Sequence, residues 1–167
     1  MIEKGSYRED SGVAAELEVR YRDLDAMGHV NNATYLTYFE QARFAYLGAL
    51  AESLSLKAGP ADPSDPRRIA FGPFEGAEFV VAEARVRYRA PAHLGERLRC
   101  AVKVAGVSRK TFVFEYRLRN GAGQLVAEGS TVQVFFDPAT GRSRPRPDWF
   151  VKAVARLEGR PEEELVR

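Results

Sequence analysis

The residues best suited to chemistry stand in one short segment, from Asp25 to Asn32. Within eight residues it holds one carboxylate, the imidazole of His29 and two adjacent carboxamides. An ionised carboxylate beside a carbonyl carbon can attack that carbon directly or deprotonate a water molecule that attacks it. If a helix begins just after the segment, its free backbone N–H groups can receive the negative charge that gathers on the carbonyl oxygen. The segment therefore suits acyl transfer, with Asp25 as nucleophile or general base.

Both titratable side chains of this segment also have simpler explanations. Asp25 could organise the turn or the start of the helix, because Asp often accepts backbone hydrogen bonds before helices. His29 could donate a hydrogen bond to the substrate carbonyl or orient Asp25, since imidazole is a donor that titrates near neutral pH. His29 could equally be a structural loop residue whose imidazole forms its hydrogen bonds with backbone groups. We take Asp25 as the catalytic candidate and His29 as an accessory one.

The elements on either side of the segment follow from residue periodicity. Leu17, Val19 and Tyr21 alternate with charged residues, which predicts a half-buried strand that runs into Asp25. Apolar residues then recur at helical spacing and predict a long, largely buried helix from Asn32 to Leu50. The chemical segment is thus expected to connect a strand to the N-terminus of a helix.

The rest of the chain is predicted to consist mostly of strands. Proline and glycine interrupt the stretch from about Ala58 to Gly76 and predict a long loop. A hairpin turn is expected at Asn120–Gly123, an Arg-Pro-rich surface connector at 142–147 and a terminal helix at Asp148–Leu157. Four strands should pair antiparallel, namely Phe79–Tyr88, Arg97–Val104, Thr111–Arg119 and Leu125–Phe136. This order predicts an α+β fold in which a five-stranded antiparallel sheet wraps the long helix, with a short C-terminal helix.

The composition is that of a globular protein. The 167 residues, 45% of them hydrophobic, suit a single domain over 1–167, with a core at about 16–137 and a C-terminal extension at 138–167. A net charge of +2 does not suggest nucleic acid or a membrane as partner. Cys100 is the only cysteine, and neither a signal peptide nor a membrane span is evident. We expect a cytoplasmic protein that needs no metal or cofactor.

The run from Tyr21 to Tyr35 resembles the signature of the 4-hydroxybenzoyl-CoA thioesterase superfamily, including its bacterial acyl-CoA members. Tyr38–Arg43 is similar to the helix that follows in that family, and Tyr88–Glu96 is similar to its usual link between two strands. The resemblance covers about Glu16 to Phe136. It implies the hot-dog fold, a homodimer or homotetramer, and hydrolysis of acyl-CoA to a free acid and CoA. The acyl group would lie in a tunnel between subunits, with the CoA phosphates near the surface.

The resemblance also implies roles for particular residues. The aspartate of an Asp-x-x-Gly loop is catalytic in this family, and Asp25 stands at that spacing before Gly28. In plant acyl-carrier-protein thioesterases, which the His29 segment also resembles, an Asp, an Asn and a His share the site, but Met27 replaces that Asn here. An acyl pocket could be lined by Tyr35, Phe39 or Phe71. Substrate contacts are expected from Gly28, Val30, Asn31, Asn32 and Tyr35.

Candidates outside the loop have stronger structural explanations. Another branch of hot-dog thioesterases carries its catalytic acid on the central helix, which makes Glu40 a second candidate, but its spacing from Arg43 suits a surface ion pair. Cys100 lies between apolar neighbours on one face of a strand and is predicted to be a small buried hydrophobe. The turn residues Arg109 and Lys110 are candidate contacts for the CoA phosphates, with Arg87, Arg89 and His93 as weaker ones.

Two other functions stay open at this point. The substrate could be an acyl-carrier protein, or the chain could bind acyl-CoA without cleaving it, because a fold alone does not establish an activity. The intact Asp25 loop favours an enzyme. The sequence does not distinguish an aromatic from an aliphatic acyl group.

Overall fold

The computed structural model describes residues 12–54 and 77–167. Two short 3-10 helices, Tyr21–Asp23 and Glu162–Glu164, accompany the main elements. These are β1 (Ala14–Glu18), α1 (Thr34–Ser53), β2 (Phe79–Tyr88), β3 (Arg97–Val107), β4 (Thr111–Asn120), β5 (Leu125–Asp137), β6 (Arg142–Ser143) and α2 (Trp149–Glu158).

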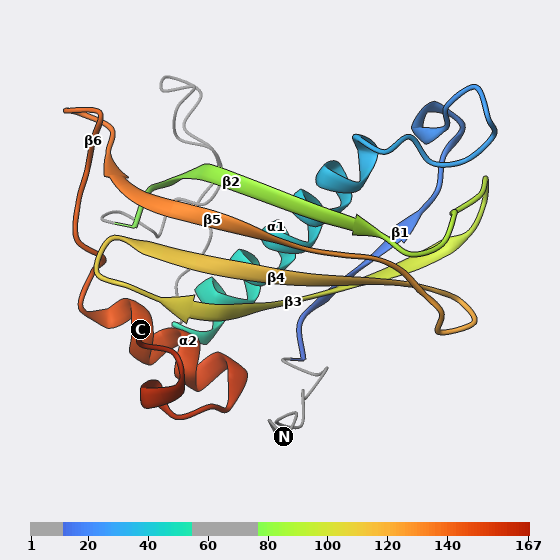
Figure 1. The fold of residues 1–167 in the computed structure, drawn as a ribbon. Coiled ribbons are helices and arrows are strands. Elements are labelled where there is room, and N and C mark those ends of the chain that lie inside the picture. The colour runs from blue at the N-terminus through green and yellow to red at the C-terminus, as the bar shows by residue number, and fades with distance from the viewer. Residues whose placement is uncertain (1–11, 55–76) are drawn as a thin grey trace, which may run out of the picture.

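The strands form one antiparallel sheet that curves around α1 (Figure 1). Its order is β1-β3-β4-β5-β2, and the short β6 pairs with the end of β5. The helix lies across the inner face of the sheet, and α2 packs beside it at one end (Figure 1). The predicted α+β hot-dog fold, with its five main strands, long helix and short terminal helix, is confirmed.

The first predicted strand was wrong in its extent. It ends at Glu18, and Tyr21–Asp23 form a 3-10 helix in place of a continuation into Asp25. The reason is local, because the Asp23 carboxylate accepts a hydrogen bond from the Arg20 backbone N–H at 2.8 Å and closes a tight turn. The predicted strand Phe79–Tyr88 matches β2, whereas β3 continues three residues beyond the predicted end at Val104.

Other predicted boundaries shift by a few residues. The long helix begins at Thr34, two residues after the predicted start, because the Asn31 side chain accepts the Ala33 N–H at 2.9 Å in a turn before the helix. The terminal helix spans Trp149–Glu158, and the connector that follows β5 begins with the unpredicted strand β6. The predicted long loop and Phe71 lie outside the described residues.

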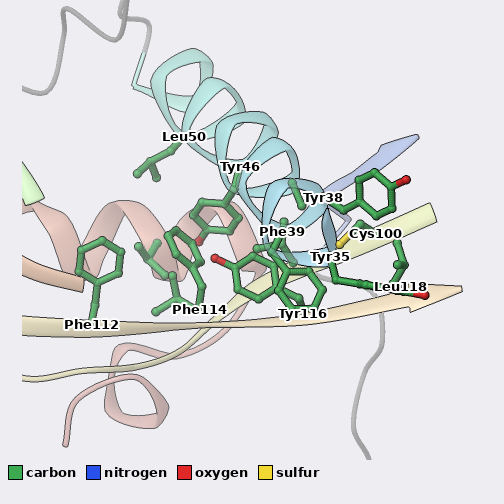
Figure 2. Close-up of a cluster of buried hydrophobic side chains, with 14 of the residues drawn as sticks. Tyr35, Tyr38, Phe39, Tyr46, Leu50, Cys100, Phe112, Phe114, Tyr116 and Leu118 are labelled. Atoms are coloured by element: carbon green, nitrogen blue, oxygen red, sulfur yellow. The ribbon is translucent and has the colours of Figure 1, made fainter. Parts of the chain in front are cut away.

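The core forms where aromatic side chains of α1 meet the inner face of the sheet (Figure 2). The rings of Phe39 and Tyr116 stack in parallel with their centroids 4.5 Å apart. This contact needs Gly129 on β5, because a Cβ atom there would lie 2.5 Å from Cε2 of Phe39 and closer still to the carbonyl oxygen of Arg85. A glycine therefore lets the helix approach the sheet at this position.

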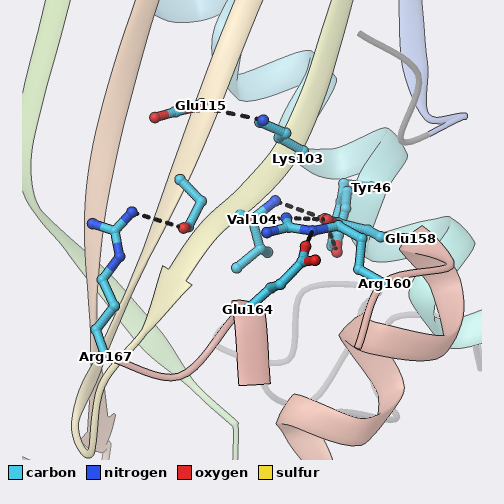
Figure 3. A network of polar contacts seen from close by, with 9 residues as sticks. Tyr46, Lys103, Val104, Glu115, Glu158, Arg160, Glu164 and Arg167 are labelled. Atoms are coloured by element: carbon cyan, nitrogen blue, oxygen red, sulfur yellow. Dashed lines mark hydrogen bonds and ion pairs between the residues drawn. The ribbon is translucent and has the colours of Figure 1, made fainter. Parts of the chain in front are cut away.

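The C-terminal extension is attached to the core through a buried carboxylate (Figure 3). The Glu158 side chain is 0% exposed, and its Oε1 accepts hydrogen bonds from the Tyr46 hydroxyl at 2.8 Å and the Val104 backbone N–H at 2.7 Å. Its Oε2 lies 3.0 Å from Nη1 of Arg160. Burial, together with this carboxylate, raises the pKa of Tyr46, so the hydroxyl stays protonated and acts as a donor.

The last residues of the chain also cover the free edge of β3. Val107 donates its N–H to the Leu165 carbonyl at 2.7 Å, and Arg167 donates its N–H to the Val107 carbonyl at 3.0 Å. These bonds satisfy backbone groups that would otherwise be exposed beyond the end of β1. In the part of the chain that the structure describes, no helix is long and apolar enough to cross a membrane.

We predict that Gly129→Ala destabilises the fold by about 1–3 kcal/mol, because the new methyl group forces Phe39 or β2 to move. The matched control is Gly48→Ala in α1, where a Cβ atom meets nothing within 4 Å and alanine should add up to about 1 kcal/mol of helix stability. Urea unfolding of both variants measures the difference. Equal stability of the two variants would contradict the proposed close approach.

Candidate active site

The segment from Leu24 to Val30 folds back on itself as a tight loop. Leu24 and Val30 form an isolated antiparallel bridge. Inside the bridge, the Asp25 N–H donates to the His29 carbonyl at 2.8 Å, and the Gly28 N–H donates to the Asp25 carbonyl at 3.1 Å. Gly28 has a φ of 78°, a conformation that glycine adopts without strain. The Asp-x-x-Gly spacing therefore corresponds to a tight turn in which the Gly28 N–H bonds to the Asp25 carbonyl and Gly28 has a positive φ.

The loop holds the Asp25 carboxylate in an exposed position. Its Oδ1 accepts the Met27 backbone N–H at 2.8 Å, which restrains the side chain. Among the described residues, no donor is bound to Oδ2. The carboxylate is thus oriented through one oxygen and available through the other.

An open cleft of about 360 Å³ lies beside this carboxylate. Five predicted site residues line it, as does Arg89, which was a weaker candidate. Tyr88, Ala90 and Pro91 also line it and were not predicted as site residues, although they belong to the strand link that carried part of the resemblance. The predicted residues in the wall are Asp25, His29, Val30, Asn32 and Tyr35.

The N-terminus of α1 is part of the same wall. The Thr34 N–H donates to the Asn31 carbonyl at 2.9 Å, so Asn31 stabilises the turn before the helix with its backbone as well as its side chain. In the described part of the chain, no acceptor is bound to the N–H groups of Asn32 and Tyr35. Asn32 and Tyr35 also line the cleft, so the start of α1, with two N–H groups that lack an acceptor, lies beside it.

Tyr88 connects the end of β2 to this helix start. Its hydroxyl donates to the Asn32 carbonyl at 2.9 Å, and its ring meets the Tyr35 ring edge-on at 5.1 Å. The Arg89 guanidinium beside it is paired with Glu128 on β5. Arg89 therefore lines the cleft, but its positive charge is paired with the Glu128 carboxylate.

The two histidines of the chain lie together at this site. The rings of His29 and His93 meet edge-on with centroids 5.1 Å apart. Nδ1 of His93 is 3.5 Å from Oε1 of Glu96, and the Val30 N–H donates to the Ala92 carbonyl at 2.9 Å. The turn that carries His93 is thus fastened to the Asp25 loop. The contact between His29 and His93 was not predicted from the sequence.

Several predicted residues lie away from the cleft. Glu40 forms the predicted ion pair with Arg43, at 3.5 Å, and Nη1 of Arg43 donates to the buried Tyr116 hydroxyl at 3.2 Å. Arg109 and Lys110 form the turn between β3 and β4, at the opposite end of the sheet (Figure 1). The fold of the chain does not bring these two cations to Asp25.

Cys100 is fully buried, as predicted. Burial raises the pKa of its thiol to about 12, so the reactive thiolate is disfavoured. In residues 12–54 and 77–167, no group of three or more His, Cys, Asp and Glu side chains is arranged to hold a metal ion.

A neighbouring carboxylate, Asp23, connects the loop to α1 by hydrogen bonds. It is buried, and it accepts the Tyr38 hydroxyl at 3.0 Å as well as the Arg20 N–H, while its carbonyl accepts the Asn31 N–H at 2.8 Å. Burial opposes ionisation, but these hydrogen bonds and the Arg20 guanidinium outweigh it and lower the pKa of Asp23. Asp23 therefore links the loop to α1 as an anion, a role that the sequence did not indicate.

The fold and the site together define a hot-dog protein with a loop carboxylate beside a helix N-terminus, and comparison with known proteins agrees. The family model of the thioesterase-like superfamily matches residues 19–154. The acyl-CoA thioester hydrolase YbgC of Escherichia coli is 30% identical over 135 residues, which are 81% of this chain and 90% of that protein. The chain belongs to the thioesterase-like superfamily, and the predicted family resemblance is confirmed.

Two further relatives extend the comparison. A structure of a thioesterase complexed with coenzyme A and Zn from Thermus thermophilus is 33% identical, with a TM-score of 0.69 over 89% of this chain and 96% of that one. The chloroplastic acyl-acyl carrier protein thioesterase ATL2 of Arabidopsis thaliana is 27% identical over 120 residues, which are 70% of this chain and 56% of that protein. The names of these relatives therefore include one thioesterase for acyl-CoA and one for acyl-acyl carrier protein.

We predict that Asp23→Asn lowers the free energy of unfolding by about 1–3 kcal/mol at neutral pH, because hydrogen bonds to a charged acceptor are lost. Since the folded pKa lies below the ordinary value of about 3.9, the difference from wild type should shrink as the pH falls through the folded pKa. Urea unfolding at pH 7 and near pH 3 measures it, with the exposed Asp148→Asn as control. A difference that grows as the pH falls would be inconsistent with the assigned role.

Proposed function

We propose that this protein hydrolyses acyl-CoA thioesters to a carboxylic acid and CoA, with Asp25 as the catalytic carboxylate. The observation that carries the proposal is the shared wall of the cleft. Asp25, Asn32 and Tyr35 line it together, and the N–H groups of Asn32 and Tyr35 have no acceptor among the described residues. Membership of the thioesterase-like superfamily and the Escherichia coli relative support the choice of substrate.

The arrangement suits two routes of hydrolysis. In one, Oδ2 of Asp25 attacks the thioester carbon, the C–S bond breaks, the CoA thiolate leaves, and water then hydrolyses the mixed anhydride. In the other, Asp25 takes a proton from a water molecule that attacks the same carbon, and CoA leaves as before. In both routes the carbonyl oxygen becomes an oxyanion, which the N–H groups of Asn32 and Tyr35 are positioned to receive. His29, in the same wall, serves as an additional donor to this oxygen.

The alternative substrate is an acyl-carrier protein, which the Arabidopsis relative's name favours. The plant-type arrangement of Asp, Asn and His is incomplete here, because Met27 stands in place of the Asn and its side chain is 77% exposed. A purely binding role is less well supported, because the available Oδ2 of Asp25 has no structural partner in the described residues. The cytoplasmic location and the absence of a cofactor stay predictions.

We also propose that the working unit is a homodimer, or a tetramer of such dimers, formed through β2. This strand is at the edge of the sheet, most of its residues are exposed, and Val80 and Val81 keep 46% and 45% of their surface accessible. An edge of ten residues with exposed valines is a surface that another strand can extend. The same strand ends in the cleft wall at Tyr88, so a partner there would enclose an otherwise open site.

We predict that Asp25→Asn lowers kcat for acyl-CoA hydrolysis by about 10²–10⁴-fold, because the amide keeps the shape but provides neither a nucleophile nor a base. The matched control is Glu40→Gln, which should keep near wild-type activity because Glu40 lies outside the cleft wall. Thiol release is measured for short, long and aromatic acyl-CoA, with the fold of each variant checked.

The outcomes of this panel separate the alternatives. Full activity in Asp25→Asn together with a loss in Glu40→Gln would move catalysis to the helix. No turnover of any acyl-CoA by the wild type would favour carrier-protein substrates or a binding role. The acyl-CoA that is turned over fastest defines the acyl class.

We predict that the double substitution Val80→Lys and Val81→Lys converts the oligomer to a monomer, since charges on a strand edge oppose edge pairing. Analytical ultracentrifugation measures the mass, and thiol release measures the accompanying loss of activity. Val166→Lys is the control, because Val166 is 46% exposed in the C-terminal tail, away from β2. An unchanged mass of the double variant would exclude β2 as the interface.

A further inference from the structure

The end of β2 is joined to the start of α1 by a hydrogen bond between residues that lie 56 positions apart in the sequence. The Tyr88 hydroxyl donates to the Asn32 carbonyl at 2.9 Å, and the Tyr88 ring meets the Tyr35 ring edge-on. Tyr88 is itself held by the sheet, because its backbone pairs with Ala127 on β5. The sheet thus contacts the start of the helix through the Tyr88 side chain.

The Asn32 carbonyl needs this donor because the regular hydrogen bonds of α1 begin after it. Ala33 is the N-cap residue, and its carbonyl accepts the Leu36 N–H at 3.2 Å. Among the described residues, no backbone N–H donates to the Asn32 carbonyl. The Tyr88 hydroxyl therefore satisfies a backbone acceptor that the helix leaves without a partner.

The peptide group between Asn32 and Ala33 is held at both ends by side chains. Its carbonyl accepts the Tyr88 hydroxyl, and its N–H, which belongs to Ala33, donates to Oδ1 of Asn31 at 2.9 Å. Because a peptide group is planar, these two hydrogen bonds together fix its orientation. The preceding peptide group carries the Asn32 N–H and shares the Cα atom of Asn32, so it is restrained as well.

The restrained backbone belongs to the wall of the cleft. Asp25, Asn32, Tyr35 and Tyr88 all line it, and the N–H groups of Asn32 and Tyr35 have no acceptor in the part of the chain that the structure describes. Donors of this kind stabilise a developing oxyanion best when the backbone already holds them in place before the reaction. A hydrogen bond that fixes this backbone can therefore raise the rate without contacting the substrate.

We propose that Tyr88 is a positioning residue, which holds the start of α1 through the Asn32 carbonyl while negative charge develops on the thioester oxygen. This inference rests on the proposed function. Asn31 holds the other end of the same peptide group and acts together with Tyr88. The Tyr88 hydroxyl stays bound to Asn32 throughout the reaction and takes no part in proton transfer.

The first test is Tyr88→Phe, which removes the hydroxyl but keeps the ring that meets Tyr35. For acyl-CoA hydrolysis, kcat should fall about tenfold, with KM changed by less than about twofold. The free energy of unfolding in urea should stay near the wild-type value, because Tyr88 is 51% exposed and water can bind the Asn32 carbonyl instead. The control is Tyr21→Phe, which removes the hydroxyl of a tyrosine that is 83% exposed and should behave as wild type.

Three results of this test would contradict the proposal. An unchanged kcat would show that the hydrogen bond does not matter for the reaction. A higher KM with an unchanged kcat would make Tyr88 a direct contact of the substrate. A loss of activity that matches a loss of folded protein would leave Tyr88 with a structural role alone.

The second test changes Asn31 at the other end of the peptide group. Asn31→Ala removes the acceptor of the Ala33 N–H and should lower kcat, whereas Asn31→Ser should keep most of the activity, because a serine hydroxyl can accept the same N–H. In the double variant Tyr88→Phe, Asn31→Ala, the combined loss of kcat should be smaller than the product of the two single losses, since both side chains hold one peptide group. A combined loss equal to that product would overturn the shared role.

Failure of this inference is distinguishable from failure of the proposed function. If the wild type hydrolyses acyl-CoA and Tyr88→Phe changes nothing, only the inference fails. If the wild type cleaves no thioester, the proposed function fails, and NMR relaxation then decides the inference. The order parameters of the Asn32, Ala33 and Tyr35 amides should fall in Tyr88→Phe but not in Tyr21→Phe. Unchanged order parameters in Tyr88→Phe would refute the positioning role.

Discussion

The structure depends on the burial of α1, a helix that is apolar on nearly all sides. Tyr38, Phe39, Ala42, Tyr46 and Leu50 are each 1% exposed or less, and they lie together on one broad face of the helix. So broad an apolar face must be covered, and a sheet covers more of it by curving around the helix. The strands therefore curve around this face of α1 (Figure 1), whereas Leu36, Glu40 and Phe44 on the opposite side of the helix are exposed. The N-terminal end carries the candidate site.

Three core tyrosines connect this buried helix to the functional parts of the chain. The hydroxyl of Tyr38 reaches Asp23 below the catalytic loop, and that of Tyr46 reaches Glu158 in the C-terminal extension. The hydroxyl of Tyr116 lies between Arg43 and Thr131 beneath the sheet. Each ring buries apolar surface while its hydroxyl satisfies a charged or polar partner. The loop and the extension are thus positioned by the same packing that stabilises the core.

The proposed chemistry uses backbone groups at least as much as side chains. The loop orients Asp25 through the Met27 N–H, and the helix start presents the N–H groups of Asn32 and Tyr35. Donors held by a folded backbone need little reorganisation when negative charge develops on a substrate. The cleft lies at the Tyr88 end of β2, whose free edge is exposed along the strand. Assembly and enclosure of the substrate are therefore expected to be coupled.

The sequence alone determined the features that depend on local order along the chain. Alternation identified the main strands and helical spacing identified α1, because each pattern reflects the backbone geometry of consecutive residues. The loop with Asp25 and Gly28 was identified by its resemblance to a known family. The sequence also predicted the ion pair between Glu40 and Arg43, because side chains three positions apart lie close together on a helix.

Only the tertiary structure decided the relations between distant segments. It placed Tyr88 against Asn32, His93 against His29 and Glu158 against Tyr46, contacts that no periodicity contains. It also ended β1 early, because the buried Asp23 closes a turn that alternation cannot indicate. The order and register of the strands determine which strand ends and turns lie close together. That register results from the packing of the whole sheet around α1, so the separation of Arg109 from Asp25 became visible only in the folded protein.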